Sequence, residues 1–157
     1  MVNTLWLNIR CFQILLVSFI IKTRQDSMTF EEEIKARSLS EDMARIKRDV
    51  WSSYGDFLFG SDIASIHELT DFQAAFLDLM DEKWNEVLHP LISKNVTEEF
   101  DSWYEEGGSY EKIMMQSLDI KDLDKEGWQI MFEDDNMDLI VHLYMKGWAL
   151  DHTARTG

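Results

Sequence analysis

Residues 128–146 read WQIMFEDDNMDLIVHLYMK, and they carry the clearest structural signal in the chain. Apolar and polar residues alternate on both sides of its centre, and β-branched and aromatic residues are frequent, which is typical of strands with one buried face. Between the two alternating runs stands Asp134-Asp135-Asn136, and these residue types tolerate the left-handed backbone of tight turns. The stretch therefore predicts an antiparallel hairpin. Its alternating apolar residues are Trp128, Ile130, Phe132, Leu139, Val141, Leu143 and Met145.

The sequence on either side of the hairpin extends the predicted sheet. Gly147 predicts a turn, and residues 148–153 then predict one more short strand. On the other side, residues 110–118 are compatible with a strand or a helix, and we favour the strand. The C-terminal part of the chain thus predicts an antiparallel sheet of three to four strands.

Residues 29 to about 104 carry a different pattern, with apolar residues three and four positions apart. This spacing predicts amphipathic helices with one buried stripe. Thr29 with Glu32, and Thr70 with Gln73, form two capping boxes, which are signals of helix starts. Ser40, which two acidic residues follow, predicts another start, and that helix should end by about residue 59.

Two further signals concern the end of the helical part. Pro90 should end or bend the helix that starts at Thr70, because its ring removes an amide donor and disfavours helix at the preceding residue. Thr97 then predicts a short helix, which Gly107-Gly108 ends. The whole pattern predicts an α+β fold, with N-terminal amphipathic helices packed on the C-terminal sheet.

Charge divides the 157-residue chain into two unequal parts. The chain carries 15 basic and 30 acidic residues, a net charge of −15; residues 1–27 contribute +2, so residues 28–157 carry −17. We therefore expect a leader, residues 1–27, and one acidic α+β domain, residues 28–157. The whole chain has 45% apolar residues, which is enough hydrophobic side chains for one core.

The leader contains an apolar run, Cys11 to Ile21, that is shorter than the roughly 20 residues a membrane-spanning helix needs. We consider three interpretations: a signal segment, a membrane anchor, and upstream sequence with Met28 as the true start. The capping box at Thr29 favours the third. On that interpretation the protein is cytoplasmic; on the first two it is exported or anchored to a membrane.

The leader hypothesis predicts that residues 1–27 are dispensable for folding. A chain of residues 28–157 should unfold cooperatively, with a midpoint close to that of the full chain, because the helix at Thr29 has its own capping box. Thermal unfolding of the two chains measures this. Loss of the cooperative transition on truncation would contradict the hypothesis.

The strong acidity bears on the kind of partner. A charge of −17 disfavours nucleic acid and anionic membranes, and it favours a protein partner with a basic surface. We therefore expect a small soluble protein, not itself an enzyme, that masks a basic enzyme as an inhibitor or immunity-type protein. Acidity that serves only solubility is the alternative. The predicted contacts are acids beside aromatic residues: Trp103, Tyr104, Glu105, Glu106, Glu133, Asp134 and Asp135.

An enzyme or ligand-binding domain is the second hypothesis. If the last strands pair, His142 and Tyr144 lie near Asp151 and His152, and such a group is able to transfer protons in a pocket between helices and sheet. A half-buried sheet histidine is the simpler interpretation, because no nucleophile elbow or phosphate-binding loop accompanies the group. No motif indicates a cofactor, so we expect none.

A third hypothesis is a calcium-responsive module. Asp122, Asp124, Glu126 and Glu133, with Gly127 at the sixth position, have the spacing of an EF-hand calcium loop. However, the residues that follow alternate like a strand, whereas an EF-hand requires a helix there. We therefore favour a solvated turn and expect no metal site.

Overall fold

The structure is a computed structural model that describes residues 28–105 and 110–157. The predicted leader, Glu106 and the helix stop at Gly107-Gly108 lie outside the described residues. The helical elements are α2 (Phe30–Ser38), α3 (Met43–Tyr54), the 3₁₀ helix η1 (Gly55–Ser61), α4 (Asp71–Lys83), the π-helix η2 (Trp84–Leu88), α5 (His89–Tyr104) and the 3₁₀ turn η3 (Leu123–Lys125). The strands are β1 (Ile113–Asp119), β2 (Gly127–Asp134), β3 (Ile140–Lys146) and β4 (Ala149–Thr156).

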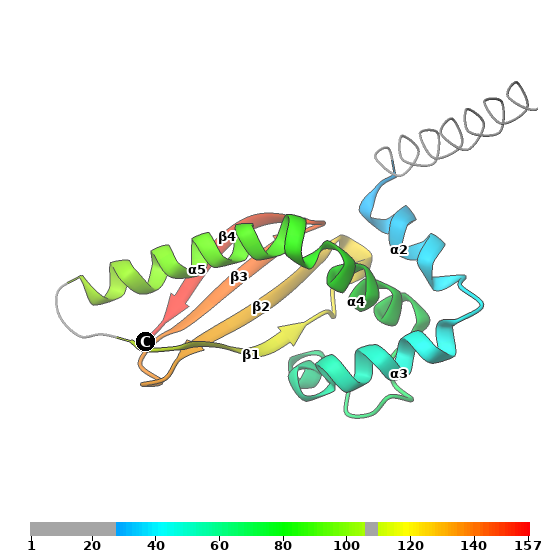
Figure 1. The fold of residues 1–157 in the computed structure, drawn as a ribbon, viewed down its shortest axis with the longest axis horizontal. Helices are drawn as coiled ribbons and strands as arrows, with labels where there is room; N and C mark the ends of the chain where they lie inside the picture. The colour runs from blue at the N-terminus through cyan, green and yellow to red at the C-terminus, as the bar shows by residue number, and fades with distance from the viewer. Residues whose placement is uncertain (1–27, 106–109) are drawn as a thin grey trace, which may run out of the picture.

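The predicted α+β fold is confirmed (Figure 1). The strands form one antiparallel sheet in the order β1-β2-β3-β4, and residues 128–146 form its central hairpin. The register sets Ile130 opposite Leu143 and Phe132 opposite Val141, so the alternating apolar residues share one face. The last strand also forms, after a turn at Gly147 with the positive φ of 58° that glycine adopts readily.

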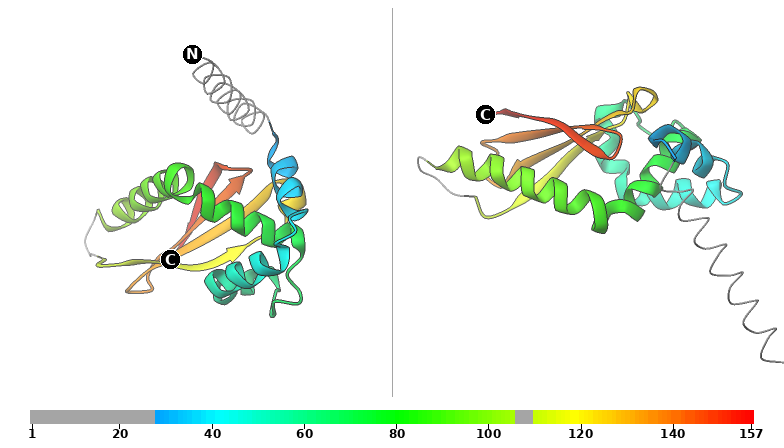
Figure 2. Two further views of the ribbon diagram at one scale, coloured as in Figure 1. Left: turned by 45° about the vertical axis from the view of Figure 1, so that its right-hand side comes forward. Right: turned by 90° about the horizontal axis from the view of Figure 1, so that it is seen from above.

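The helices cover the apolar face of the sheet. Seen from above, α5 runs along that face, and α2, α3 and α4 gather at one end of the sheet (Figure 2). Phe76 of α4 and Phe100 of α5 are fully buried there, together with Ile130 and Leu143 of the central strands. No helix within residues 28–105 and 110–157 is long and apolar enough to cross a membrane.

Both predicted capping boxes are present, with Thr29 bonded to Glu32 and Thr70 bonded to Gln73. The start at Ser40 is wrong by a few residues. Helix α3 begins at Met43, and the Ser40 hydroxyl accepts from the amide of Asp42 at 3.2 Å instead.

The prediction of a separate helix at Thr97 is also wrong, because Thr97 lies inside α5. Pro90 does not end the helical chain. The wide π-turn of η2 precedes it, and Pro90 occupies the first turn of α5, a position that proline often takes. The chain bends at this point, as the different directions of α4 and α5 show (Figure 1).

The outer edge of β1 is covered by η1. The hydroxyl of Ser61 donates to the carbonyl of Leu118 at 3.2 Å and accepts from the amide of Ile120 at 2.7 Å. An uncovered edge strand presents unpaired backbone groups that pair readily with other chains. Ser61 thus satisfies part of this edge from within the chain.

Replacement of Ser61 by alanine tests the importance of this contact. Ser61→Ala should lower the free energy of unfolding by about 1–3 kcal/mol, because it removes a buried acceptor from the Ile120 amide. Urea unfolding measures the change. Ser53→Ala is the matched control, since the Ser53 hydroxyl bonds only to the carbonyl of Asp49 in its own exposed helix face. Equal stability of the two variants would contradict this assignment.

Candidate functional site

Two of the predicted contact segments, 103–105 and 133–135, come together at one end of the molecule. The C-terminus of α5, the start of β1 and the β2–β3 hairpin meet there (Figure 1). The hydroxyl of Tyr104 donates to the carboxylate of Asp134, which joins α5 to the hairpin. Exposed acidic side chains surround this junction, and we call them the acidic end: Asp101, Glu105, Glu111, Asp135 and Asp138.

Asp134 has a structural position, and its prediction as a partner contact is corrected. Its side chain is fully buried. One carboxylate oxygen accepts from the amides of Asp138 at 3.0 Å and Leu139 at 3.4 Å, and the other accepts from Tyr104. These bonds close the hairpin turn, and the bond to Asp134 raises the pKa of Tyr104 above its usual value. A partner has no access to this carboxylate.

The remaining predicted acids differ in their surroundings. The Asp135 carboxylate accepts from the amides of Glu111 at 3.0 Å and Lys112 at 3.2 Å, and these backbone bonds lower its pKa. It is nonetheless exposed, as is Glu105. Glu133 is half-buried and accepts a bond of 2.7 Å from the Gln116 amide. Asp135 and Glu105 are therefore the predicted acids most accessible to a partner.

Trp103 is the exposed aromatic residue at this end. Its side chain is 41% exposed, and the guanidinium of Arg155 lies over the ring at 5.9 Å from the centroid. The ring centroids of Tyr104 and Tyr110 are 5.7 Å apart, and the Tyr110 hydroxyl donates to the carboxylate of Asp101 at 2.7 Å. The acidic end therefore combines exposed carboxylates with an accessible indole, the type of side chain that often anchors protein interfaces.

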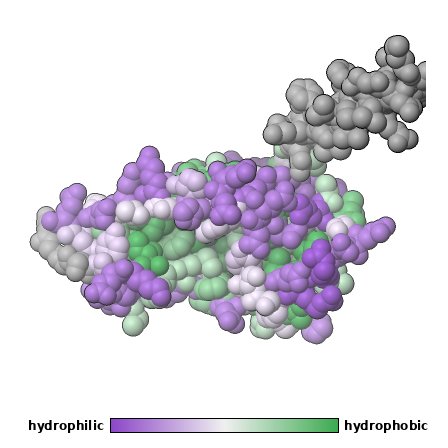
Figure 3. Space-filling view, viewed as in Figure 1, coloured by the Kyte–Doolittle hydropathy of each residue, from purple (hydrophilic) through white to green (hydrophobic). Residues whose placement is uncertain are grey.

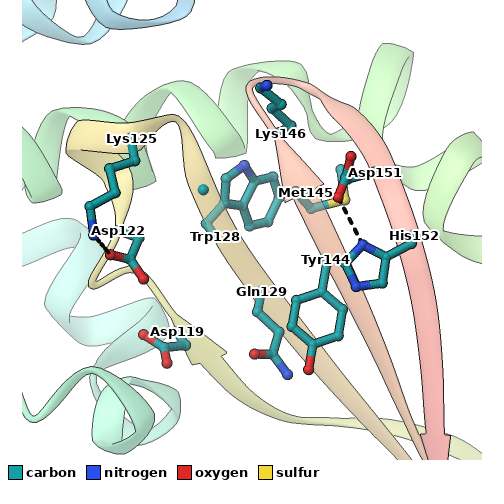
Figure 4. Close-up of a pocket in the computed structure, with 11 residues that line it drawn as sticks. Asp119, Asp122, Lys125, Trp128, Gln129, Tyr144, Met145, Lys146, Asp151 and His152 are labelled. Atoms are coloured by element: carbon teal, nitrogen blue, oxygen red, sulfur yellow. Dashed lines mark hydrogen bonds and ion pairs between the residues drawn. The ribbon is translucent and has the colours of Figure 1, made fainter.

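The second predicted site, around His142, lies on the face of β3 and β4 that points away from α5. Its predicted position between helices and sheet is therefore wrong, because strands and the η3 turn, and no residue of α2 to α5, line the cavity there. A cavity of about 350 Å³ opens there, lined in part by Tyr144, Asp151 and His152 (Figure 4). The rings of Tyr144 and His152 stack at 4.4 Å, and His152 bonds to Asp151 at 2.8 Å. Three of the four predicted residues thus line one cavity, and the fourth, His142, does not.

His142 is held between two neighbours. Its Nδ1 lies 2.6 Å from the Gln129 amide nitrogen, and its Nε2 lies 3.0 Å from the Thr156 hydroxyl. With Gln129 donating to Nδ1, the ring is neutral and Nε2 donates to Thr156. Burial lowers the pKa of His142, which favours this neutral form. Both ring nitrogens are therefore engaged in holding the sheet together.

The loop with calcium-loop spacing does not fold into that geometry. Residues 123–125 form the short turn η3, and β2 begins at Gly127. Glu133, the twelfth position, lies about 20 Å along this extended strand, at the rise of 3.3 Å per residue. Lys125 pairs with Asp122 at 2.6 Å. Among the described residues, no group of three or more His, Cys, Asp or Glu side chains is arranged to hold a metal ion.

One cavity brings together residues that no sequence motif singled out. It measures about 440 Å³ and lies between α3, the α4–η2 junction and the strands β1 and β2. In the sequence its lining residues belong to separate predicted helices and strands, in which aromatic and apolar residues ordinarily indicate core. Only the three-dimensional structure shows that these residues line one cavity. The lining residues are Tyr54, Asp81, Trp84, Asn85, Met115 and Phe132.

Comparisons with known proteins give no assignment for either site: no family model, curated protein or solved structure matches the chain.

The junction of Tyr104 and Asp134 yields a stability prediction. Asp134→Ala should lower the free energy of unfolding by about 2–3 kcal/mol, because it leaves two hairpin amides and one hydroxyl without their acceptor. Tyr104→Phe, which removes the hydroxyl but keeps the ring and leaves the Asp134 carboxylate its two amide donors, should cost less, about 1 kcal/mol.

Urea unfolding of both variants measures these losses. Asp124→Ala is the matched control, because Asp124 is exposed in η3 and should change stability by less than about 0.5 kcal/mol. An Asp134→Ala protein as stable as the control would mean that the buried carboxylate does not hold the hairpin.

Proposed function

We propose that the protein binds a second protein with a basic surface, through the acidic end and Trp103, and that it acts as an inhibitor or immunity-type mask of a basic enzyme. One observation carries the proposal: acids from three separate segments converge beside an exposed indole. The Tyr104–Asp134 bond holds two of these segments together. The surface is thus prearranged, which reduces the entropic cost of binding.

The negative charge of the domain supports a partner with a basic surface. Residues 28–157 carry −17, and Glu105, Glu111 and Asp135 extend that charge to the rim of the acidic end. A concentrated field of one sign speeds the encounter with an oppositely charged protein and rejects anionic partners. Rim charges of this kind act mainly on the association rate.

Trp103 supplies the second element of the proposed interface. Its ring already contacts a cation, since Arg155 lies over it and also pairs with Glu99 at 3.7 Å. A partner's arginine or lysine is able to occupy the same type of position over the indole. Burial of the ring would then slow dissociation, as buried aromatic anchors do.

A second candidate function rests on the cavity of about 350 Å³ beside Tyr144 and His152. Its volume falls in the usual range for small-molecule sites, and Tyr144 and His152 form a stacked pair of aromatic rings at its wall. The candidate is a ligand-binding domain, or an enzyme with His152 and Asp151 as a proton-transfer pair. Binding of a basic protein that survives mutation of Tyr144 and His152 would favour the first function.

The partner proposal predicts a charge-dependent association. The immobilised chain should capture a basic protein from its source lysate at low salt, and release it near 0.5 M salt, where the Debye length is only a few Å. Against the captured protein, Glu105→Lys should lower the association rate about tenfold. Trp103→Ala should raise the dissociation rate instead. Surface plasmon resonance separates the two rates.

Glu41→Lys is the matched control, because it makes the same charge change at an exposed residue between α2 and α3, away from the acidic end. It should leave both rates within about twofold of the original. If Glu41→Lys weakens association as much as Glu105→Lys, the net charge and not the acidic end attracts the partner. If no basic protein is captured at low salt, the masking function is wrong.

A further inference from the structure

The cavity of about 440 Å³ beside Trp84 has a mostly apolar wall. Trp84, Met115 and Phe132 form it, and Trp84 and Phe132 also border a smaller cavity of about 180 Å³ that lies against Ile92, Val96 and Ile113. Hydrophobic surface gathers over the sheet below α5, with hydrophilic surface around it (Figure 3). The larger volume lies within the range of small-molecule sites.

A single carboxylate faces this apolar wall. Among the described residues that line the two cavities, the exposed Asp81 is the only acid, and His89 of the smaller cavity is the only base. The other acids of α4 have cationic partners: Asp71 pairs with Lys47, and Asp78 and Glu82 both pair with Arg37. Among the described residues, no lysine, arginine or histidine forms an ion pair with Asp81. Its charge is thus available to a ligand.

Tyr54 fixes the position of that carboxylate. Its hydroxyl donates to Oδ1 of Asp81 from α3, across the cavity mouth. Burial, and then this bond, raise the pKa of Tyr54 well above its usual value, so the phenol remains a donor at neutral pH. The other oxygen of Asp81 has no hydrogen bond within the described residues. The carboxylate is therefore oriented by one bond and still has an oxygen to accept another.

The π-helix η2 places the remaining wall. The amide of His89 bonds to the carbonyl of Trp84, five residues earlier, and this wide turn carries Trp84 and Asn85 at the side of the cavity. Single π-turns of this kind are often found at functional sites, because they re-aim side chains at a cost in helix geometry. Here the turn adds an aromatic face and an amide next to Asp81.

We propose that this cavity binds a small apolar molecule with one ammonium group. The apolar body packs on Trp84, Met115 and Phe132, and the ammonium donates to the free oxygen of Asp81. The aromatic rings nearby favour a cation further. An anionic ligand meets repulsion from Asp81, and a neutral ligand covers the carboxylate without pairing it, which is costly. The site is separate from the acidic end and does not depend on the proposed protein partner.

Three probes with the same skeleton test the proposal: 4-phenylbutylammonium, 4-phenylbutanol and 4-phenylbutyrate. We expect the ammonium to bind the full chain about fivefold to tenfold more tightly than the alcohol, because only the ammonium forms a charge-assisted bond with Asp81. The carboxylate should bind least, because Asp81 repels it. Proton–nitrogen NMR titration measures this from the Trp84 indole signal, which the Trp84→Phe variant assigns. The Trp84 signal should shift with the ammonium.

Asp81→Asn keeps an acceptor for Tyr54 and removes the charge, so it should erase the preference for the ammonium over the alcohol. Asp124→Asn, an equal charge change on the exposed turn η3, should leave the preference unchanged. A preference that survives Asp81→Asn, equal binding of all three probes, or no shift of the Trp84 signal at 5 mM probe would overturn the proposal. If a captured basic protein shifts the Trp84 signal while none of the three probes does, the proposal is also wrong, and the cavity receives a side chain of that protein instead.

Discussion

The fold depends on one aromatic cluster, in which Phe76 packs against Trp128 of β2 and Trp148 of the β3–β4 turn. The ring of Phe76 stacks on that of Trp148 with the centroids 5.5 Å apart, and it packs edge-on against Trp128 with a centroid distance of 5.1 Å. Phe30 of α2 also packs edge-on against Trp148, with a centroid distance of 4.9 Å. Each indole also has a polar partner: Trp128 donates to the carbonyl of Gly147, and Trp148 donates to Glu33. Helices from the first half of the chain are thereby attached to the end of a sheet formed by the second half.

The elements that the sequence predicts correctly are those whose signals are local. A capping box such as Thr29 with Glu32 is complete within four residues, and the hairpin at 128–146 needs only its own alternation and turn. Thr97 failed for the opposite reason. It has the composition of a helix start, but Val96 and Phe100 continue the buried stripe of α5, and that packing outweighs a local capping preference. Tertiary contacts of this kind have no local sequence signal.

In the candidate sites, too, the sequence predicts what depends on local signals and does not predict what depends on tertiary contacts. The sequence identifies acids beside aromatic residues, and both segments do lie at one end of the molecule. It does not show which of three successive acids, Glu133 to Asp135, turns inward, because the hairpin geometry decides that. The cavity beside Asp81 was not predictable at all. Its walls come from α3, α4, η2, β1 and β2, and a tyrosine or tryptophan on an apolar stripe has the same sequence pattern whether it fills a core or borders a cavity.

The single π-turn at Trp84–Leu88 sets the rotational phase between two long helices. An α-helix turns by about 100° per residue, and a π-turn holds one more residue than an α-turn. A regular α-helical ladder through the same residues would instead rotate everything after this point by about 100°. The stripe of Ile92, Val96 and Phe100 would then leave the sheet. The π-turn thus lets the chain carry one extra residue between α4 and α5 while both helices keep their buried faces toward the core.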